Sequence, residues 1–330
     1  MQADRLLYRR FGEPRDVLEL ERRTLPAPQA RELLVRLAAR PINPSDLIPI
    51  RGAYAHRIPL PGVPGYEGVG YVEAVGPGVP ASWLGKRVLP LRGEGTWQQL
   101  AVAPAEWAVE VPDSLDDDTA AQLYINPVTA ILLCTEIAPS RPGDWWVVNA
   151  GGSAIGRVLA QLSRVLGFRL IAVTRSGAHT ASLLALGAEH VLDAFDAALG
   201  PLPERVQELT GGRGAAVAID SVGGPAGLEL LACTRPGGMM LGIGLLSGTP
   251  LNLSAAAAQA DVRFGLFHLR HWLQDVTPAG WHAAFERIVG LLDAGQLRLS
   301  PIAGRYPLEA YREAIEAAER SGGAGKILLV

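Results

Sequence analysis

The feature that most restricts the fold is an alternation of short apolar runs and amphipathic segments in the middle of the chain. Residues 144–149 (DWWVVN) form a largely apolar run of strand length. Residues 153–167 follow, and their apolar side chains recur every three or four positions, as on one face of a helix. A second apolar run covers residues 170–173. Because strands joined through a helix pair in parallel, this order predicts a parallel sheet with helices on its faces.

The alternation continues as far as residue 243. We expect further helices at 180–186, 203–209 and 226–234 and further strands at 190–192, 215–220 and 239–243. Beyond residue 250 the alternation fades, and we expect a helix at 279–293, a strand at 298–302, a helix at 308–320 and a last strand at 326–330. The predicted fold class is α/β with a doubly wound parallel sheet.

The first part of the chain has a different pattern. Short apolar runs separated by Gly and Pro are typical of strands. Six prolines between residues 41 and 65 predict that this segment lacks regular structure. A chain of 330 residues is long enough for two compact domains. We expect a β-rich domain made of residues 1–121 and 296–330, and a sheet domain made of residues 122–295.

The turn between the first strand and the first helix of the sheet domain has the composition of a dinucleotide-binding loop. One glycine permits the tight turn, another permits close packing of strand and helix, and the free N–H groups at the helix start attract a pyrophosphate. Ser153 replaces the middle glycine of the usual pattern, so the motif alone is a weak indication. The strand predicted before it and the helix predicted after it strengthen the assignment. A purely structural turn is the alternative. The residues expected to bind the cofactor are Asn149, Gly151, Gly152, Ser153, Ala154, Ile155 and Gly156.

The end of the second strand indicates which dinucleotide binds. Arg175 lies there, 19 residues after Gly156. A carboxylate at this place would bind the ribose 2′-hydroxyl of NADH, whereas a guanidinium binds the 2′-phosphate of NADPH with paired hydrogen bonds. We therefore predict NADPH as the cofactor, held in part by Thr174, Arg175 and Ser176. The alternative is that Arg175 is an ordinary surface cation.

The composition argues against several classes of partner. The formal net charge is −3, from 30 basic and 33 acidic residues without a long basic run, so we expect neither nucleic acid nor a membrane surface as partner. The two cysteines, Cys134 and Cys233, are too few for a disulfide framework or a four-cysteine zinc site. The N-terminus lacks an apolar leader, and we expect a cytoplasmic protein.

Four motifs resemble those of the medium-chain dehydrogenase/reductase superfamily: residues 42–46 (INPSD), 65–70 (GYEGVG), 76–79 (GPGV) and the loop 149–156. The resemblance covers almost the whole chain. It implies an oxidoreductase with a GroES-like β-rich catalytic domain and a Rossmann domain. Zinc-dependent members of the superfamily have Cys where this chain has Asn43 and His where it has Tyr66. Because an amide and a phenol are poor zinc ligands, we expect no catalytic metal.

Within the zinc-free branch, the chain is most similar to the mitochondrial-type 2-enoyl thioester reductases. The similar stretches are 51–54 (RGAY), 95–97 (GTW) and 126–130 (NPVTA), whereas 264–272 departs from that family at Leu266 and His268. The resemblance implies hydride transfer from NADPH to an enoyl thioester in a homodimeric enzyme, with sheet edges joined near residues 238–246. It also implies roles for four residues: Tyr54 as hydrogen-bond and proton donor, Asn43 and Asn126 beside the nicotinamide, and Lys326 near the cofactor.

Two other functions stay open on the sequence. NADPH:quinone reductases are the next most similar family, so a quinone or another α,β-unsaturated carbonyl compound is an alternative substrate. A non-catalytic NADPH-binding relative is the second alternative, because a fold does not fix a function. For single residues, Tyr54 also fits an exposed loop aromatic, Asn43 a turn residue and Lys326 a charge at a strand edge.

Overall fold

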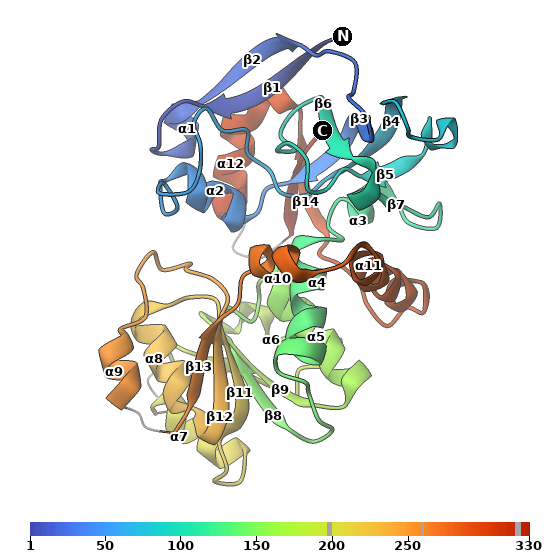
Figure 1. The fold of residues 1–330 in the computed structure, drawn as a ribbon. Coiled ribbons are helices and arrows are strands. Elements are labelled where there is room, and N and C mark those ends of the chain that lie inside the picture. Colours follow the sequence, from blue (N-terminus) through green and yellow to red (C-terminus); the bar gives the residue numbers. More distant parts are fainter. Residues whose placement is uncertain (197–199, 259–260, 321–324) are drawn as a thin grey trace. The chain divides into compact units, whose positions relative to one another are not determined.

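The computed structural model describes residues 1–330 apart from 197–199, 259–260 and 321–324 (Figure 1). The chain divides into two compact units. Unit 1 contains Met1–Ile125, Thr277–Asp293 and Leu299–Val330. Unit 2 contains Asn126–Val276 and Ala294–Arg298. No described helix is both long and apolar enough to cross a membrane.

Unit 2 is built on a parallel sheet of six strands in the order β10-β9-β8-β11-β12-β13. The strands are β8 (Trp145–Val148), β9 (Arg169–Thr174), β10 (His190–Asp193), β11 (Ala215–Asp220), β12 (Thr234–Gly242) and β13 (Arg263–Leu266). The helices include α4 (Ile125–Leu132), α5 (Ala154–Leu166), α6 (Thr180–Leu186), α7 (Leu202–Leu209) and α8 (Gly224–Ala232). The chain leaves the centre in both directions from β8, which confirms the predicted doubly wound sheet and the α/β class.

The predicted periodicity of α5 corresponds to its packing. Val158, Leu159 and Leu162 are at most 2% exposed, and Leu162 follows the other two by four and three positions. The helix begins at the N-cap Ser153 and ends at Gly167, which adopts the left-handed conformation that favours glycine. The first turn of α5 therefore lies at the carboxyl end of β8, directly after the glycine-rich loop.

The edge of this sheet differs from the sequence expectation. The segment 238–246 was the expected edge, but β12 lies between β11 and β13. The edge strand is β13, which pairs with β12 from Met239–Arg263 to Gly242–Leu266. These four residues include Arg263 and Gly265, so the strand lacks the apolar run by which the other strands of the sheet are recognised in the sequence. Two short helices in the same region were also not predicted, α9 (Leu253–Ala258) and α10 (Leu269–Asp275).

Unit 1 contains a seven-stranded sheet and a two-stranded sheet. In the large sheet the order is β14-β15-β3-β4-β5-β7, with β6 also paired to β3. Its strands are β3 (Glu32–Pro41), β4 (Val69–Val75), β5 (Arg87–Leu89), β6 (Leu100–Pro104), β7 (Val109–Glu110), β14 (Ile302–Tyr306) and β15 (Lys326–Leu329). The small sheet pairs β1 (Gln2–Tyr8) with β2 (Leu18–Thr24). The helices are α1 (Pro14–Val17), α2 (Pro44–Ile50), α3 (Asp117–Ala120), α11 (Pro278–Asp293) and α12 (Tyr311–Arg320).

The C-terminal segment packs into the core of unit 1. Ala314 and Ile315 of α12 and Leu329 of β15 are fully buried in one apolar cluster with Leu6 and Trp97. In Figure 1 the red C-terminal elements α12 and β14 accordingly lie among the blue N-terminal ones. The last strand was expected at 326–330 and is found at Lys326–Leu329.

Two local expectations for unit 1 are wrong. The proline-rich segment 41–65 contains α2, because Pro44 occupies the first helical turn, where its missing N–H has no partner to lose. The strand expected at 298–302 is β14, which begins only at Ile302. Before it, the Arg298 N–H donates to the side chain of Gln161 at 2.7 Å and Pro301 has no N–H to donate.

Helix α11 belongs to unit 1, whereas the sequence argument keeps residues 279–293 in the sheet domain. Trp281 is the physical reason. Its ring is fully buried and packs edge-on against Trp107 with the centroids 5.9 Å apart, and its Nε1 donates to the Trp107 carbonyl at 3.0 Å. A large aromatic ring anchored in this way fixes the helix to the turn between β6 and β7 that contains Trp107.

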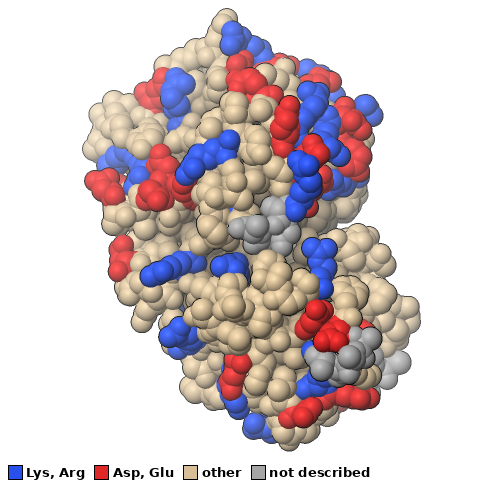
Figure 2. Space-filling view, turned by 180° about the vertical axis from the view of Figure 1, so that it is seen from behind, with Lys and Arg blue, Asp and Glu red and all other residues tan. Residues whose placement is uncertain are grey.

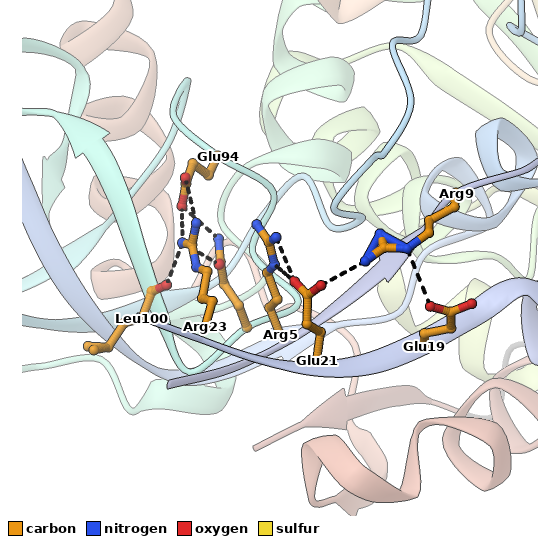
Figure 3. Close-up of polar contacts among 8 residues, drawn as sticks. Arg5, Arg9, Glu19, Glu21, Arg23, Glu94 and Leu100 are labelled. Atoms are coloured by element: carbon orange, nitrogen blue, oxygen red, sulfur yellow. Dashed lines mark hydrogen bonds and ion pairs between the residues drawn. The ribbon is translucent and has the colours of Figure 1, made fainter. Parts of the chain in front are cut away.

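The arginines near the N-terminus are paired with acids (Figure 3). Arg5 lies opposite Glu21 in the β1–β2 register and donates to its carboxylate at 2.6 and 2.8 Å. Arg9 donates to the same carboxylate at 2.8 Å and lies 3.7 Å from Glu19. On the face of unit 1 seen in Figure 2, basic and acidic side chains intermingle. These arginines thus form a solvated, charge-balanced face.

Candidate functional site

The glycine-rich loop of unit 2 lies where ligands bind in doubly wound sheets, at the carboxyl ends of the strands beside the point where the strand order reverses. Ser153 closes the loop as the N-cap of α5, and its Oγ accepts the Gly156 N–H at 3.3 Å. Ser153, Ala154 and Ile155 are partly exposed. The N–H groups at the start of a 13-residue helix are therefore available to an anion.

Close packing explains the glycines in this loop. A Cβ on Gly151 would lie 2.9 Å from the Cβ of Ala172, and a Cβ on Gly156 would overlap the Gly151 carbonyl. The loop is also held by its backbone, because the Gly151 N–H donates to the Val173 carbonyl at 2.9 Å. Strand, loop and helix thus approach one another as closely as a dinucleotide-binding turn requires, and the residues present fit a pyrophosphate.

Asn149 joins the ends of two neighbouring strands. Its Nδ2 donates to Asp220 at 2.5 Å, and its Oδ1 accepts the Ser221 N–H at 2.7 Å. Asp220 also accepts the N–H groups of Val222 and Gly223, both at 2.9 Å. Asn149 is 5% exposed. Its amide holds the loops after β8 and β11 together, and its expected direct contact with the cofactor stays a prediction.

The turn after β9 presents Arg175 to solvent. Thr174 is buried, and its hydroxyl donates to the Ser176 carbonyl at 2.9 Å, which fixes the turn. Arg175 and Ser176 are exposed. Within the part of the chain that the structure describes, the Arg175 guanidinium has no hydrogen bond or ion pair. An exposed guanidinium on a fixed turn is suited to a phosphate.

His179 is a candidate that the sequence argument does not find. A Cβ on Gly152 would overlap the His179 ring, so this ring lies directly against the glycine-rich loop. His179 stands four residues after Arg175, at the start of α6. Its position just before the helix predicted at 180–186 is the only signal in the sequence, and that signal does not show that the ring contacts Gly152.

Unit 1 contains a second candidate site, a buried polar cluster around the start of α2. Asn43 is the N-cap of α2, and its N–H donates to Asp46 at 2.7 Å. Asp46 also accepts the Tyr66 N–H at 3.0 Å, which fastens the loop 65–67 to the helix. The Asn43 side chain lies between two charged groups: Nδ2 donates to Glu67 at 2.7 Å, and Oδ1 accepts from Lys326 Nζ.

The second carboxylate oxygen of Glu67 accepts two backbone N–H groups. They come from Ile125 at 2.8 Å and Tyr124 at 3.2 Å. Glu67 is 1% exposed. Burial raises the pKa of Glu67, and burial likewise raises the pKa of Asp46, to about 7. Burial lowers the pKa of Lys326. Each shift disfavours the charged form, so the cluster depends on mutual compensation of its charges.

Tyr54 lies in the turn that follows α2. Its ring is half-buried, and the Arg57 guanidinium stacks over it with 4.1 Å to the ring centroid. The Tyr54 carbonyl accepts the Arg57 N–H at 3.0 Å, so the turn and the stacked pair stabilise each other. Tyr66 is 46% exposed, and partial burial and the charge of Asp46 raise its pKa to about 12.

The structure groups the expected site residues by unit. Unit 2 brings together the loop 149–156 and the turn 174–176. Unit 1 contains Tyr54 and joins Asn43 directly to Lys326. Asn126 is partly exposed in the first turn of α4 and is counted with unit 2. Among the described residues, no group of three or more His, Cys, Asp and Glu side chains is placed to hold a metal ion.

Comparison with known protein families matches both units. The alcohol dehydrogenase GroES-like domain matches residues 29–113, and the family described as zinc-binding dehydrogenase matches residues 154–286. The fold and these two domains define an oxidoreductase, and the chain belongs to the medium-chain dehydrogenase/reductase superfamily.

Similar proteins include enoyl reductases and quinone reductases. Human mitochondrial enoyl-[acyl-carrier-protein] reductase is 32% identical over 98% of this chain and 87% of its own length. A putative NADPH:quinone reductase from Bacillus thuringiensis is 49% identical with a TM-score of 0.96, covering 100% of this chain and 99% of its own. Escherichia coli quinone oxidoreductase complexed with NADPH is 26% identical with a TM-score of 0.90, covering 99% of both chains. Both groups were expected from the sequence.

Proposed function

We propose that this protein is an NADPH-dependent reductase that transfers a hydride to an activated carbon–carbon double bond, with a trans-2-enoyl thioester as substrate. The observation that carries the proposal is the combination, in unit 2, of a glycine-lined start of α5 with the exposed Arg175 at the end of β9. The full-length similarity to enoyl-[acyl-carrier-protein] reductases supports the substrate class.

The residues of unit 2 divide the binding of the nucleotide between them. The N–H groups of Ala154 and Ile155 bind the pyrophosphate at the start of α5, where the helix dipole favours negative charge. Arg175 binds the 2′-phosphate, with Ser176 beside it on the same exposed turn. Bound NADPH supplies the hydride. No metal takes part in this proposal, because Asn43 and Tyr66 replace the usual zinc ligands.

Tyr54 of unit 1 is the proposed proton donor. As hydride reaches the β-carbon of the substrate, negative charge develops on the thioester oxygen, and a phenol hydroxyl can donate a hydrogen bond to it. One well-placed donor of this kind contributes about 3 kcal/mol to the transition state. Asn43 and Asn126 are proposed to orient the nicotinamide and substrate. The stacked Arg57 limits the movement of the Tyr54 ring.

Tyr54→Phe tests the donor. The variant keeps the ring and its stacking on Arg57 but loses the hydroxyl. We expect kcat to fall about a hundredfold with the Kd for NADPH unchanged, because the hydroxyl acts only as charge develops. Steady-state kinetics and calorimetry measure the two quantities. An unchanged kcat would remove Tyr54 from the mechanism.

A quinone reductase is the second candidate function. The observation that favours it is the 49% identical relative described as a putative NADPH:quinone reductase. A panel of crotonyl-CoA, a long-chain enoyl-CoA and a naphthoquinone separates the candidates. Turnover of thioesters supports the first proposal, and turnover of quinones alone supports the second. NADPH binding without turnover of any of the three would indicate a non-catalytic relative.

We also propose that the protein forms a homodimer through the edge strand β13. Leu266 in this strand is 65% exposed, and an apolar edge strand is prone to pair with another strand. Leu266→Lys should convert the dimer into a monomer in light-scattering measurements. A wild-type protein that is monomeric at micromolar concentration would refute this assembly.

For the place of action we propose the cytoplasm. Both cysteines, Cys134 and Cys233, are buried free thiols, as is usual for a protein in a reducing compartment. Fractionation of cells that express the native protein would test this, and recovery in an organelle fraction would contradict it.

A further inference from the structure

Lys326 is an unusual lysine because its charged end is inside unit 1. The residue begins β15 and is 8% exposed, although lysine is almost never buried without a partner. Its Nζ donates to the Asn43 side chain, 283 positions away in the chain. In the described part of the chain, this amide oxygen is the hydrogen-bond partner of the ammonium, and no carboxylate lies within ion-pair distance of it.

Glu67 provides the opposite charge on the other side of the same amide. Asn43 Nδ2 donates to Glu67 at 2.7 Å, so the Asn43 amide lies between the Lys326 ammonium and the Glu67 carboxylate. The far oxygen of Glu67 is fixed by the Ile125 and Tyr124 N–H groups. Burying either charge alone would be strongly unfavourable, whereas the two charges compensate each other through the bridging amide.

The two charges determine which way the amide of Asn43 points. In the observed orientation its oxygen accepts from the ammonium and its nitrogen donates to the carboxylate. Rotation by 180° would place the N–H donors against the ammonium and the oxygen against the carboxylate, and both contacts would be repulsive. The Asn43 backbone is fixed as well, through its N–H bond to Asp46.

We propose that Lys326 is a positioning residue, which fixes the amide orientation of Asn43 and compensates the buried charge of Glu67. Its role is thus distinct from the cofactor contact expected from the sequence. The consequence for catalysis rests on the proposed function, in which Asn43 orients the reactants. The charge compensation does not depend on that function, because it is a property of unit 1 alone.

The charge compensation has a pH signature. The titratable groups that face Glu67 are Lys326 from β15, Asp46 from α2 and the Tyr124 phenol. Lys326 lowers the pKa of Glu67 against the raising effect of burial. Without the ammonium, this folded-state pKa rises further above the unfolded value. A carboxyl group whose pKa is higher in the folded than in the unfolded state destabilises the fold progressively as pH rises from the unfolded pKa to the folded pKa.

Thermal unfolding of three variants tests the charge compensation. Lys326→Met should have a lower Tm than wild type, with a difference that widens from pH 5 to pH 8. Lys326→Met/Glu67→Gln should lose this widening, because no titrating carboxylate remains at position 67. Glu67→Gln alone is the matched control. If the difference for Lys326→Met is the same at both pH values, the compensation is refuted. If the widening persists in the double variant, Asp46 and not Glu67 is the compensated group.

Kinetics and NADPH binding test the positioning role. Lys326→Met should reduce kcat about tenfold to hundredfold with the Kd for NADPH unchanged, because a misplaced group costs catalysis and not cofactor binding. The double variant should stay as impaired in kcat as Lys326→Met, since an amide at position 67 has one oxygen for three N–H donors and neither charge remains to orient Asn43. A rise in the NADPH Kd with unchanged kcat would overturn the proposal in favour of direct cofactor contact. If the wild type turns over none of the substrates, the Tm and Kd measurements still decide the proposal.

Discussion

Single residues decide how closely the loop of unit 2 is packed. Gly156 has the backbone of Gly151 against it, and Gly152 has the His179 ring against it. The two constraints differ, because a backbone carbonyl cannot move aside whereas a side-chain ring can rotate. The glycines of the loop are thus required by contacts within the protein, before any ligand is considered.

Gly152→Ala tests this packing. The added methyl group overlaps the His179 ring, which must move away from the loop. We expect a lower Tm, with a loss of about 1 kcal/mol or more in the free energy of unfolding and in the free energy of NADPH binding, which is typical of overpacking. His179→Ala in the same chain should restore most of the Tm. Failure of the second substitution to rescue the first would show that the ring is not the constraint.

The site residues differ in how far the sequence alone reveals them, for physical reasons. Gly151, Ser153 and Gly156 were accessible because a strand, a loop and a helix follow one another within a few residues, and local chemistry sets their roles. The Asn43–Lys326 contact was not accessible because it joins residues 283 positions apart through the fold of unit 1. The role of Glu67 was missed for the same reason, since its partners come from α2 and residues 124–125.

Among the elements, the strands of unit 2 were predicted closely, and the segments around β13 and α2 were not. The apolar runs of β8, β9 and β11 are buried on both sides and lack any competing pattern. In β13 and α2 the chain has a charge, a glycine or prolines in a short element, and tertiary pairing or capping decides the structure. Short elements with mixed composition carry too little local signal to be recognised.

The β1–β2 pair offers a prediction about charge. Glu21 is shared by Arg5 and Arg9, and the hydrogen bond with Arg5 holds its pKa below the usual value. A lowered folded pKa stabilises the protein above the unfolded pKa, and this contribution is lost as pH falls through the folded value. Glu21→Gln should therefore lower the free energy of unfolding at pH 7 by up to about 1 kcal/mol, with little effect at pH 3.

Glu19→Gln is the matched control for this prediction. Glu19 is more exposed than Glu21 and lies 3.7 Å from Arg9, so its removal should have a smaller effect. Urea unfolding at two pH values and two salt concentrations measures both variants. Equal effects of the two substitutions at pH 7 would contradict the assignment of Glu21 as the centre of the network.

At the level of the whole chain, each unit gathers segments that are distant in sequence. Unit 1 combines the N-terminal part, α11 and the C-terminal strands, and unit 2 contains the glycine-rich loop. Trp281 attaches α11 to the rest of unit 1 through ring contacts with Trp107 and Tyr124. The length of the chain and its change of pattern were sufficient to expect two domains, with residues 296–330 in the first. The buried ring of Trp281 decides to which domain α11 belongs.

Trp281→Ala tests the role of this ring. The substitution removes a fully buried side chain and the hydrogen bond to the Trp107 carbonyl. We expect a loss of about 3–5 kcal/mol in the free energy of unfolding. Trp281→Phe keeps part of the packing and should lose less. Differential scanning calorimetry would show the change, and a variant with wild-type stability would contradict the assignment of the ring as the anchor of α11.

Recognition of the 2′-phosphate by Arg175 is tested most directly by the Kd of NADPH and of NADH for wild type and Arg175→Ala. We expect that wild type prefers NADPH and that the variant loses this preference by at least about tenfold, because the guanidinium contacts only the 2′-phosphate. Affinity for NADH should stay the same. An NADPH preference that survives the substitution, or a wild type that binds neither nucleotide, would contradict this expectation.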